Sequence, residues 1–470
     1  MEITMKKTPL AVAIVLLATT PYALAEEDSS IYGITPSASV AFTTDYVWRG
    51  VSQSNNDAAI QGSFDLSHEM GFYVGAWGSS YEFGDRASME LDVYGGFANE
   101  TDFGGTLPFA LSYDVGVLRY EYTDEPDLGF TELYFGASVS PFENFNFSTY
   151  YYYGLKVDHT RPGEYTDLAA DYTVPDSLGG FTLLGHAGYY NKKDGTDDYW
   201  DWKIGIAKDI GGFNFEVAYT DTDDSSNGNL DDARVVATVS RELGGSSAES
   251  ASMLPEGFET SATAALTTDY IWRGVSQTNN NPAVQGSFDV AHDSGFYLGV
   301  WASNVDFGDI TTPSLEIDTY IGFSRETNFG GLLPFNFTYD LGYLRYDFPS
   351  ASTATINELY IGGSIAPVEN LNVGVTYFYG IKTNHIAPGE YTDMGIDYTL
   401  PDALGAVTLL SHAGYYNQKR GADDYWDWKL GVAKDFGDFN FEVAYTETDD
   451  TGIDSKTDDA KVVGTISATF

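Results

Sequence analysis

The chain contains the stretch Asp45-Tyr46-Val47-Trp48-Arg49-Gly50-Val51-Ser52-Gln53 and repeats it 224 residues later as Asp269-Tyr270-Ile271-Trp272-Arg273-Gly274-Val275-Ser276-Gln277. A second stretch, Tyr199-Trp200-Asp201-Trp202-Lys203, returns after 226 residues as Tyr425-Trp426-Asp427-Trp428-Lys429. The small drift in spacing indicates that one structural unit was duplicated and that its loops were then trimmed. The unit is far longer than the roughly 20–50 residues of a solenoid or propeller repeat, so each copy is expected to be a complete fold.

The N-terminal residues have the features of a secretory signal peptide. Lys6 and Lys7 form a basic start, an apolar segment follows over Leu10–Leu17, and Ala23-Leu24-Ala25 resembles a cleavage site. No other apolar run approaches the ~18 residues that a membrane helix needs. The sequence therefore predicts an exported protein divided into a signal peptide (1–25), a first repeat (26–243), a linker (244–259) and a second repeat (260–470).

Composition excludes several classes of protein. The net charge of −46 rules out nucleic acid as a partner. The chain has no cysteine, so the fold depends on backbone pairing and side-chain packing instead of disulfides. Aromatic residues make up 15% of the sequence, which is unlike a disordered acidic chain.

Strands with two unlike faces run through each copy. Within 39–50, for example, Val40, Phe42 and Tyr46 alternate with smaller or polar residues, and similar segments recur at 107–122 and elsewhere. We expect roughly twelve strands in each copy, near the ~9–11 residues that a tilted transmembrane strand needs. Tight turns alternate with longer acidic loops, an asymmetry typical of outer-membrane barrels.

A soluble β-sandwich also alternates in this way, but three features favour an antiparallel transmembrane β-barrel. One face is rich in tyrosine, tryptophan and phenylalanine near strand ends, as an aromatic girdle requires. The other face is polar and acidic, which suits a wet lumen. The last strand ends on Phe470, and a terminal aromatic residue resembles the signal read by barrel-assembly machinery.

Two arrangements of the copies are compatible with the sequence. Each copy closes on itself as a barrel of about twelve strands, or both join into one barrel of about twenty-four. The polar linker 244–259 is much longer than the other turns on its side, and each copy is complete. These features favour two tandem barrels.

The repeated motif also carries a family resemblance. The Asp45–Gln53 run, the following Ala59–Asp65 segment and the Tyr199–Trp202 run resemble the opening and later segments of the TorF-type family of proposed porins, Proteobacterial outer-membrane barrels formerly catalogued as uncharacterised. The resemblance covers almost all of the mature chain, although such proteins usually carry one unit. It implies an outer-membrane location in a Gram-negative bacterium and a porin role, without a defined substrate or site.

Strand parity predicts which charged residues line the lumen if phenylalanine and tyrosine face lipid. The surplus of carboxylates predicts a preference for cations, unless the charges are paired and simply fill the barrel. The predicted pore-lining residues are Asp45, Arg49, Asp65, Asp92, Asp114, Glu132, Lys156, Asp171, Asp201, Lys203, Glu216, Asp269, Arg273, Asp289, Asp318, Asp340, Glu358, Lys382, Asp397, Asp427, Lys429 and Glu442.

Catalysis and metal binding are weaker interpretations. Ser411 precedes His412, but adjacent strand residues point to opposite faces, so no nucleophile–base pair is expected. The loops starting at Asp221 and Glu447 lack the spacing of a calcium loop and are interpreted as solvated acidic segments.

The predicted function is passive diffusion of small polar solutes through an outer-membrane channel without a cofactor. Its partners would be membrane lipid and, through Phe470, barrel-assembly machinery. A non-conducting structural or adhesive barrel is the second candidate, and an outer-membrane hydrolase the third.

Overall fold

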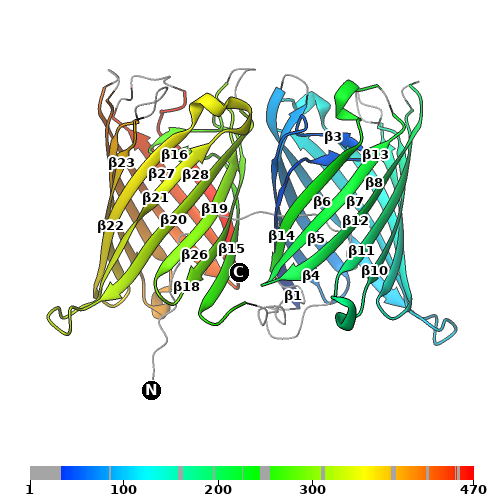
Figure 1. Ribbon diagram of the computed structural model, residues 1–470, viewed down its shortest axis with the longest axis horizontal. Helices are drawn as coiled ribbons and strands as arrows, with labels where there is room; N and C mark the ends of the chain where they lie inside the picture. The colour runs from blue at the N-terminus through cyan, green and yellow to red at the C-terminus, as the bar shows by residue number, and fades with distance from the viewer. Residues whose placement is uncertain are drawn as a thin grey trace.

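The computed structural model describes residues 33–83, 86–156, 162–193, 196–224, 226–243, 254–308, 313–382, 388–419, 423–449, 451 and 456–470. The predicted signal peptide and residues 244–253 of the predicted linker lie outside these ranges. The described residues form two closed antiparallel barrels that lie side by side (Figure 1).

The first barrel has twelve strands, each paired with its two neighbours. They are β1 (Ile34–Thr43), β4 (Ala59–His68), β5 (Phe72–Phe83), β6 (Arg86–Thr101), β7 (Leu111–Tyr122), β8 (Phe130–Phe142), β9 (Phe145–Leu155), β10 (Glu164–Thr173), β11 (Thr182–Asn191), β12 (Tyr199–Ile210), β13 (Phe213–Thr222) and β14 (Arg234–Leu243).

The second barrel repeats this arrangement. Its strands are β15 (Phe258–Thr267), β18 (Ala283–His292), β19 (Phe296–Asn304), β20 (Leu315–Thr327), β21 (Phe337–Asp347), β22 (Ile356–Val368), β23 (Leu371–Gly380), β24 (Glu390–Thr399), β25 (Thr408–Asn417), β26 (Tyr425–Phe436), β27 (Phe439–Thr448) and β28 (Lys461–Thr469). Because β15 begins at Phe258, the first strand of this barrel starts inside the segment 244–259 that the sequence assigned to the linker.

Closure occurs within each copy. Strand β1 pairs with β4 on one side and with β14 on the other, where Thr43 faces Thr238. Strand β15 pairs with β28 in the same way, and Thr267 faces Thr465. The prediction of two tandem twelve-stranded barrels is therefore confirmed, and the alternative of one twenty-four-stranded barrel is wrong.

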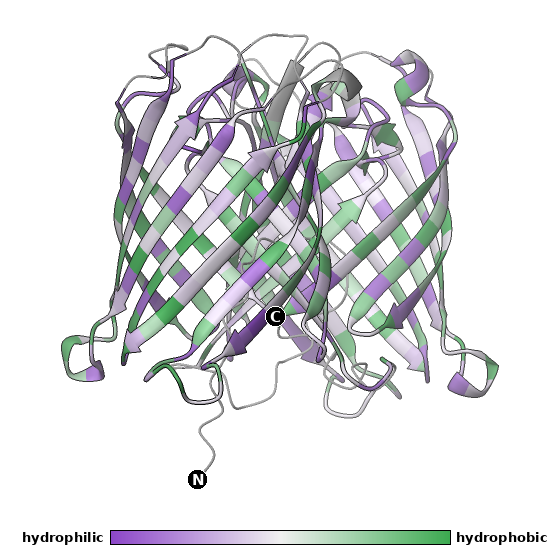
Figure 2. Ribbon diagram, turned by 60° about the vertical axis from the view of Figure 1, so that its left-hand side comes forward, coloured by the Kyte–Doolittle hydropathy of each residue, from purple (hydrophilic) through white to green (hydrophobic). Residues whose placement is uncertain are grey.

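Alternating side chains give each barrel an apolar exterior. On β12, Trp200 and Ile204 are 49% and 67% exposed on the outside, whereas Tyr199 and Asp201, on either side of Trp200, are 3% and 2% exposed. The same alternation of hydrophobic and hydrophilic residues runs along the strands in Figure 2. A polar lumen and an apolar outer surface follow from the two-residue period of an extended chain.

Strand β1 is shorter than the sequence suggested. The expected strand over 39–50 ends at Thr43, and the chain then turns into a small hairpin made of β2 (Val47–Trp48) and β3 (Val51–Ser52). The second copy has the same hairpin, made of β16 (Ile271–Trp272) and β17 (Val275–Ser276). Likewise, the strand expected over 107–122 begins only at Leu111.

Among the residues that the structure describes, helical structure is confined to short 3-10 turns in the connections. They are η1 (Pro126–Leu128), η2 (Asp176–Leu178), η3 (Gly228–Leu230), η5 (Pro349–Ala354) and η6 (Asp402–Leu404). Within the described part of the chain, none of the helices has the length and apolar character to cross a membrane.

The two barrels touch through alanine, branched aliphatic and aromatic residues on β1, β4, β15 and β18. Val40 and Ile60 of the first barrel and Val284 of the second are completely buried in one apolar cluster. Phe42 and Phe288 meet there with ring centroids 5.5 Å apart. Since these positions face outward on their own barrels, the contact joins two exteriors and leaves both lumens separate.

Paired cysteines test the closure of each copy in a chain that has no cysteine of its own. We expect T43C/T238C and T267C/T465C to form disulfides on oxidation, because each pair faces across neighbouring strands. Loss of free thiols in an alkylation assay would report the bond. The mismatched variant T43C/T465C should keep its thiols, and cross-linking in that variant alone would support the single wide barrel.

Candidate functional site

The repeated motif forms a hairpin inside each barrel. Arg49 and Gly50 occupy its two-residue turn with φ of +48° and +82°, and Val47 pairs with Ser52 on either side. Positive φ at both central residues is the geometry of a type I′ turn, which matches the twist of the flanking strands. Arg273 repeats the left-handed conformation with φ of +49°.

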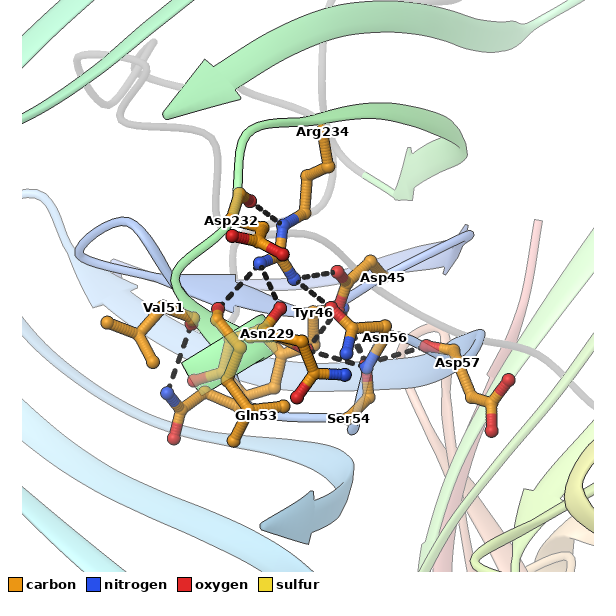
Figure 3. Close-up of polar contacts among 12 residues, drawn as sticks. Asp45, Tyr46, Val51, Gln53, Ser54, Asn56, Asp57, Asn229, Asp232 and Arg234 are labelled. Carbon is orange, nitrogen blue, oxygen red and sulfur yellow. Dashed lines mark hydrogen bonds and ion pairs between the residues drawn. The ribbon is translucent and has the colours of Figure 1, made fainter. Parts of the chain in front are cut away.

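Asp45 anchors the base of this hairpin (Figure 3). The Ser52 and Ser54 hydroxyls donate to Asp45 Oδ1 over 2.6 and 3.0 Å, and Arg234 Nη1 lies 2.7 Å from Asp45 Oδ2. Arg234 also donates to the Asn56 side chain over 2.5 Å. The hairpin base is therefore tied to the start of β14.

Asp269 plays the same part in the second barrel. Ser276 and Thr278 donate to its Oδ1 over 2.6 and 3.0 Å, and Lys461 Nζ lies 3.4 Å from its Oδ2. Lysine replaces arginine here, so the cation makes a single point contact with the carboxylate.

The hairpin tip is fixed by an ion pair across the lumen. Arg49 Nη1 and Nη2 donate to Glu132 Oε1 and Oε2 of β8 over 2.9 and 2.6 Å, with both side chains almost completely buried. In the second barrel Arg273 Nη2 donates to Glu358 Oε2 over 2.6 Å. The pairing is bidentate in the first barrel, whereas one hydrogen bond is formed between the equivalent pair in the second.

Aromatic rings surround the Arg49 guanidinium. Its carbon lies 4.2 Å from the Trp48 ring centroid, 4.4 Å from that of Tyr165, 5.1 Å from that of Tyr190 and 5.3 Å from that of Tyr152. Such distances allow cation–π attraction, which is stronger in a desolvated site. The second barrel surrounds its own guanidinium in the same way, with Trp272, Tyr391, Tyr416 and Phe378.

Further hydrogen bonds hold the hairpin against other parts of the wall. Tyr46 donates to Glu90 of β6 over 3.2 Å, and Tyr199 of β12 donates to the Arg49 carbonyl over 3.0 Å. Together with Glu132, these contacts reach three separated strands of the wall. The hairpin thus lies across the lumen and narrows it.

The structure divides the predicted pore-lining residues into four groups. Those in the hairpin networks are Asp45, Arg49, Glu132, Asp269, Arg273 and Glu358, and buried carboxylates of the wall are Asp92, Asp201, Asp318 and Asp427. Half-buried wall residues are Asp65, Asp114, Asp171, Lys203, Glu216, Asp289, Asp340, Asp397, Lys429 and Glu442. Exposed residues beyond the strand ends are Lys156 and Lys382.

Two features of that prediction need correction. Strand β9 ends at Leu155 and β23 at Gly380, so Lys156 and Lys382 belong to loops and not to the barrel wall. Asp45 and Arg49, with their counterparts, lie on the inserted hairpin because the chain leaves the wall after Thr43.

Tyrosines were missed as lumen residues because they were expected to face lipid. Tyr94 donates to Asp65 over 2.5 Å, and Tyr73 donates to Asp114 over 2.6 Å. These carboxylates are therefore solvated by neutral hydroxyls, whereas Lys203 pairs with Glu216 at 3.0 Å. Strand alternation could have identified these tyrosines, because the inward tyrosines and the carboxylates on the same strand are separated by an even number of residues.

Among the described histidines, His186 and His412 lie against carboxylates. His412 Nε2 lies 2.7 Å from Asp427 Oδ1, and its Nδ1 lies 2.9 Å from Asp393 Oδ1. The Ser411 hydroxyl points the other way and donates to the Ile396 carbonyl over 2.8 Å. His186 likewise meets carboxylates, with Asp167 Oδ2 at 3.2 Å from its Nε2.

The acidic loops are partly neutralised. Lys192 Nζ lies 2.7 Å from Asp224 Oδ2. Although partial burial opposes it, hydrogen bonding and attraction from Lys192 lower the pKa of Asp224. In the portion of the chain that is described, no group of three or more histidine and acidic side chains is arranged to hold a metal ion.

Both copies match one family model, over residues 25–242 and 248–470. The model describes a bacterial protein of unknown function, Gcw_chp. The chain belongs to this family. Its Gcw_chp units correspond to the two barrels, and the TorF-type resemblance stays a prediction. No curated protein matches the sequence.

Solved structures similar to this Gcw_chp protein include three from Pseudomonas aeruginosa. OccK5 (OpdH) has 11% sequence identity and a TM-score of 0.30, and the match covers 93% of this chain and 97% of OccK5. The outer membrane protein opdK has 10% sequence identity and a TM-score of 0.29, and the match covers 93% of this chain and 99% of opdK. The siderophore receptor PirA has 10% identity and a TM-score of 0.31, with coverage of 93% and 80%. Sequence identities and TM-scores this low give no basis for assigning the functions of these proteins to this chain.

Substitution of Gly50 tests the packing of the hairpin turn. A Cβ at Gly50 would lie 2.6 Å from Asp201 Cβ, whereas a Cβ at Gly104, which also has positive φ, would meet nothing within 4 Å. We expect Gly50→Ala to lower the free energy of unfolding by about 1–3 kcal/mol more than Gly104→Ala. Both variants carry the cost of a left-handed alanine, about 1 kcal/mol. Equal losses in chemical denaturation would contradict this packing.

Proposed function

We propose that the protein is an outer-membrane channel that passes small polar solutes by diffusion and prefers cations. Each barrel would be one pore, and the inserted hairpin would be its constriction. The observation that carries the proposal is a closed barrel with an apolar exterior and an acidic interior.

The exterior supports a membrane location. Val74, Phe135, Ile204, Ile321 and Leu430 are more than half exposed although they are large and apolar. Exposed apolar area on this scale is unfavourable in water and favourable against lipid tails. Closure also removes the unpaired strand edges that lipid does not tolerate.

The lumen supports cation preference. Asp65 and Asp114 accept hydrogen bonds from hydroxyl groups, which leaves their negative charge uncompensated by a bonded cation. Asp289 and Asp340 repeat this arrangement in the second barrel. Carboxylates that line a narrow passage favour cations over anions.

Export and assembly complete the proposal. Residues 1–25 would direct secretion into a Gram-negative envelope and be removed. Phe470, as the predicted assembly signal, has backbone hydrogen bonds of 2.6 and 2.7 Å with Ala262. The chain end that assembly machinery would read thus lies beside the strand that closes the second barrel.

A non-conducting structural barrel is the second candidate. The buried Arg49–Glu132 pair and the rings around it fill part of the lumen, which favours a blocked interior. Conductance separates the two functions, because a blocked barrel carries no current.

Planar-bilayer recording tests the channel. We expect the wild type to conduct with a cation:anion permeability ratio above one, and D114N/D340N to reduce this ratio, roughly by half or more. The control D209N/D435N removes the same charge from exposed rim positions and should leave the ratio unchanged. Anion selectivity or a complete absence of current would reject the proposed function.

A further inference from the structure

The surroundings of Arg49 have the composition of a ligand site. Glu132 of β8, Tyr152 of β9, Tyr165 of β10 and Tyr190 of β11 all belong to the barrel wall and converge on the guanidinium. We call these four residues the wall site. Only Trp48 among the surrounding rings comes from the hairpin itself, so the site's recognition groups do not depend on the hairpin's backbone.

We propose that the wall site recognises small solutes that carry a guanidinium group, and that Arg49 is its internal ligand. An incoming guanidinium would exchange for Arg49 and release the hairpin tip from the wall. The solute class deepens the proposed channel function and rests on it for access, whereas binding itself does not require conduction.

Guanidinium chemistry fits this site better than ammonium chemistry. A carboxylate accepts two parallel hydrogen bonds from the planar guanidinium, as Glu132 does from Arg49. The same plane offers its faces to aromatic rings, and guanidinium is more weakly hydrated than ammonium. A tetraalkylammonium ion would contact the rings but would replace neither of the two hydrogen bonds that Arg49 donates to the buried carboxylate.

The hairpin tip is held in a strained conformation. Arg49 has φ of +48° and Arg273 has φ of +49°, a left-handed conformation that residues with a Cβ seldom adopt. Strain of this kind persists where surrounding contacts hold it, and it favours release once those contacts are exchanged. The base would remain attached, because Asp45 and Arg234 form a separate network.

A cavity adjoins the wall site at Tyr190, near the loops of the first barrel. This cavity of about 280 Å³ is lined in part by Tyr190, Lys192 and Lys193. Lys192 is 2.7 Å from Asp224 and Lys193 is 3.2 Å from Glu164, so both positive charges beside this cavity are paired. An entering cation would therefore meet Tyr190 of the wall site without facing an uncompensated positive charge.

The second barrel offers a weaker version of the site. Phe378 stands where the first barrel has Tyr152, and Arg273 makes one hydrogen bond to Glu358. Because Arg273 keeps this second site occupied, a change at Arg49 alone exposes a single site per chain.

Arg49→Ala in detergent micelles tests the proposal, with methylguanidinium as the probe. We expect the probe, at ten times its dissociation constant, to raise the unfolding midpoint of R49A by about 3–6 °C. Methylammonium and tetramethylammonium at the same concentration should raise it by less than a third of that. The wild type, in which Arg49 competes, should respond less than R49A.

Arg119→Ala is the matched control. Arg119 pairs with Glu121 at 2.7 Å on the partly exposed outer face, so R119A also removes an arginine–glutamate ion pair but does not empty the wall site. An equal response of R119A and R49A, or no preference of R49A for methylguanidinium, would overturn the proposal.

A second measurement covers the case in which R49A does not fold alone. The variant would be refolded with methylguanidinium or methylammonium, and the folded fraction read from its heat-dependent mobility on gels. Recovery with methylguanidinium only supports the proposal, and equal or absent recovery with both rejects it. Neither readout involves current, so failure of this proposal is distinguishable from failure of the channel function.

Discussion

The ion pair between Arg49 and Glu132 connects the repeated motif to the rest of the barrel. Removing two charges from water is costly, and the cost is recovered only when geometry and hydrogen bonding are good. Here the carboxylate accepts both guanidinium hydrogen bonds and a third from Tyr120 at 3.1 Å. The rings around Arg49 add attraction. The hairpin therefore crosses the lumen because its tip has one well-matched place to bind.

Tyrosine hydroxyl groups stabilise the carboxylates of the acidic lumen. Carboxylates packed in a narrow interior repel one another, and few lysines or arginines are present to offset them. Hydroxyls from Tyr73 and Tyr94 hydrogen-bond to Asp114 and Asp65 and stabilise them without neutralising their charge. These two carboxylates thus keep their negative charge while they are hydrogen-bonded. The same balance would let the lumen attract cations without binding them permanently.

The sequence predicted the features that depend on residues close together in the chain. It did not predict those that depend on contacts between residues far apart in the chain. Alternation with a period of two predicted the strands and, with the repeats, the two barrels. It could not predict that the chain leaves the wall after Thr43, because Tyr46 and Trp48 continue the alternation. The partner that draws Arg49 inward is 83 residues away. Tyrosine was assigned to the lipid face since its ring and hydroxyl suit both environments.

A double-mutant cycle on Arg49 and Glu132 tests the central claim most directly. The free energy of unfolding would be measured for the wild type, R49A, E132A and R49A/E132A. Each single change leaves a buried charge without its partner, so we expect losses of about 3–5 kcal/mol. The double variant should lose much less than the sum, with a coupling energy of about 2 kcal/mol or more. Additive losses would show that the two side chains do not meet inside the barrel.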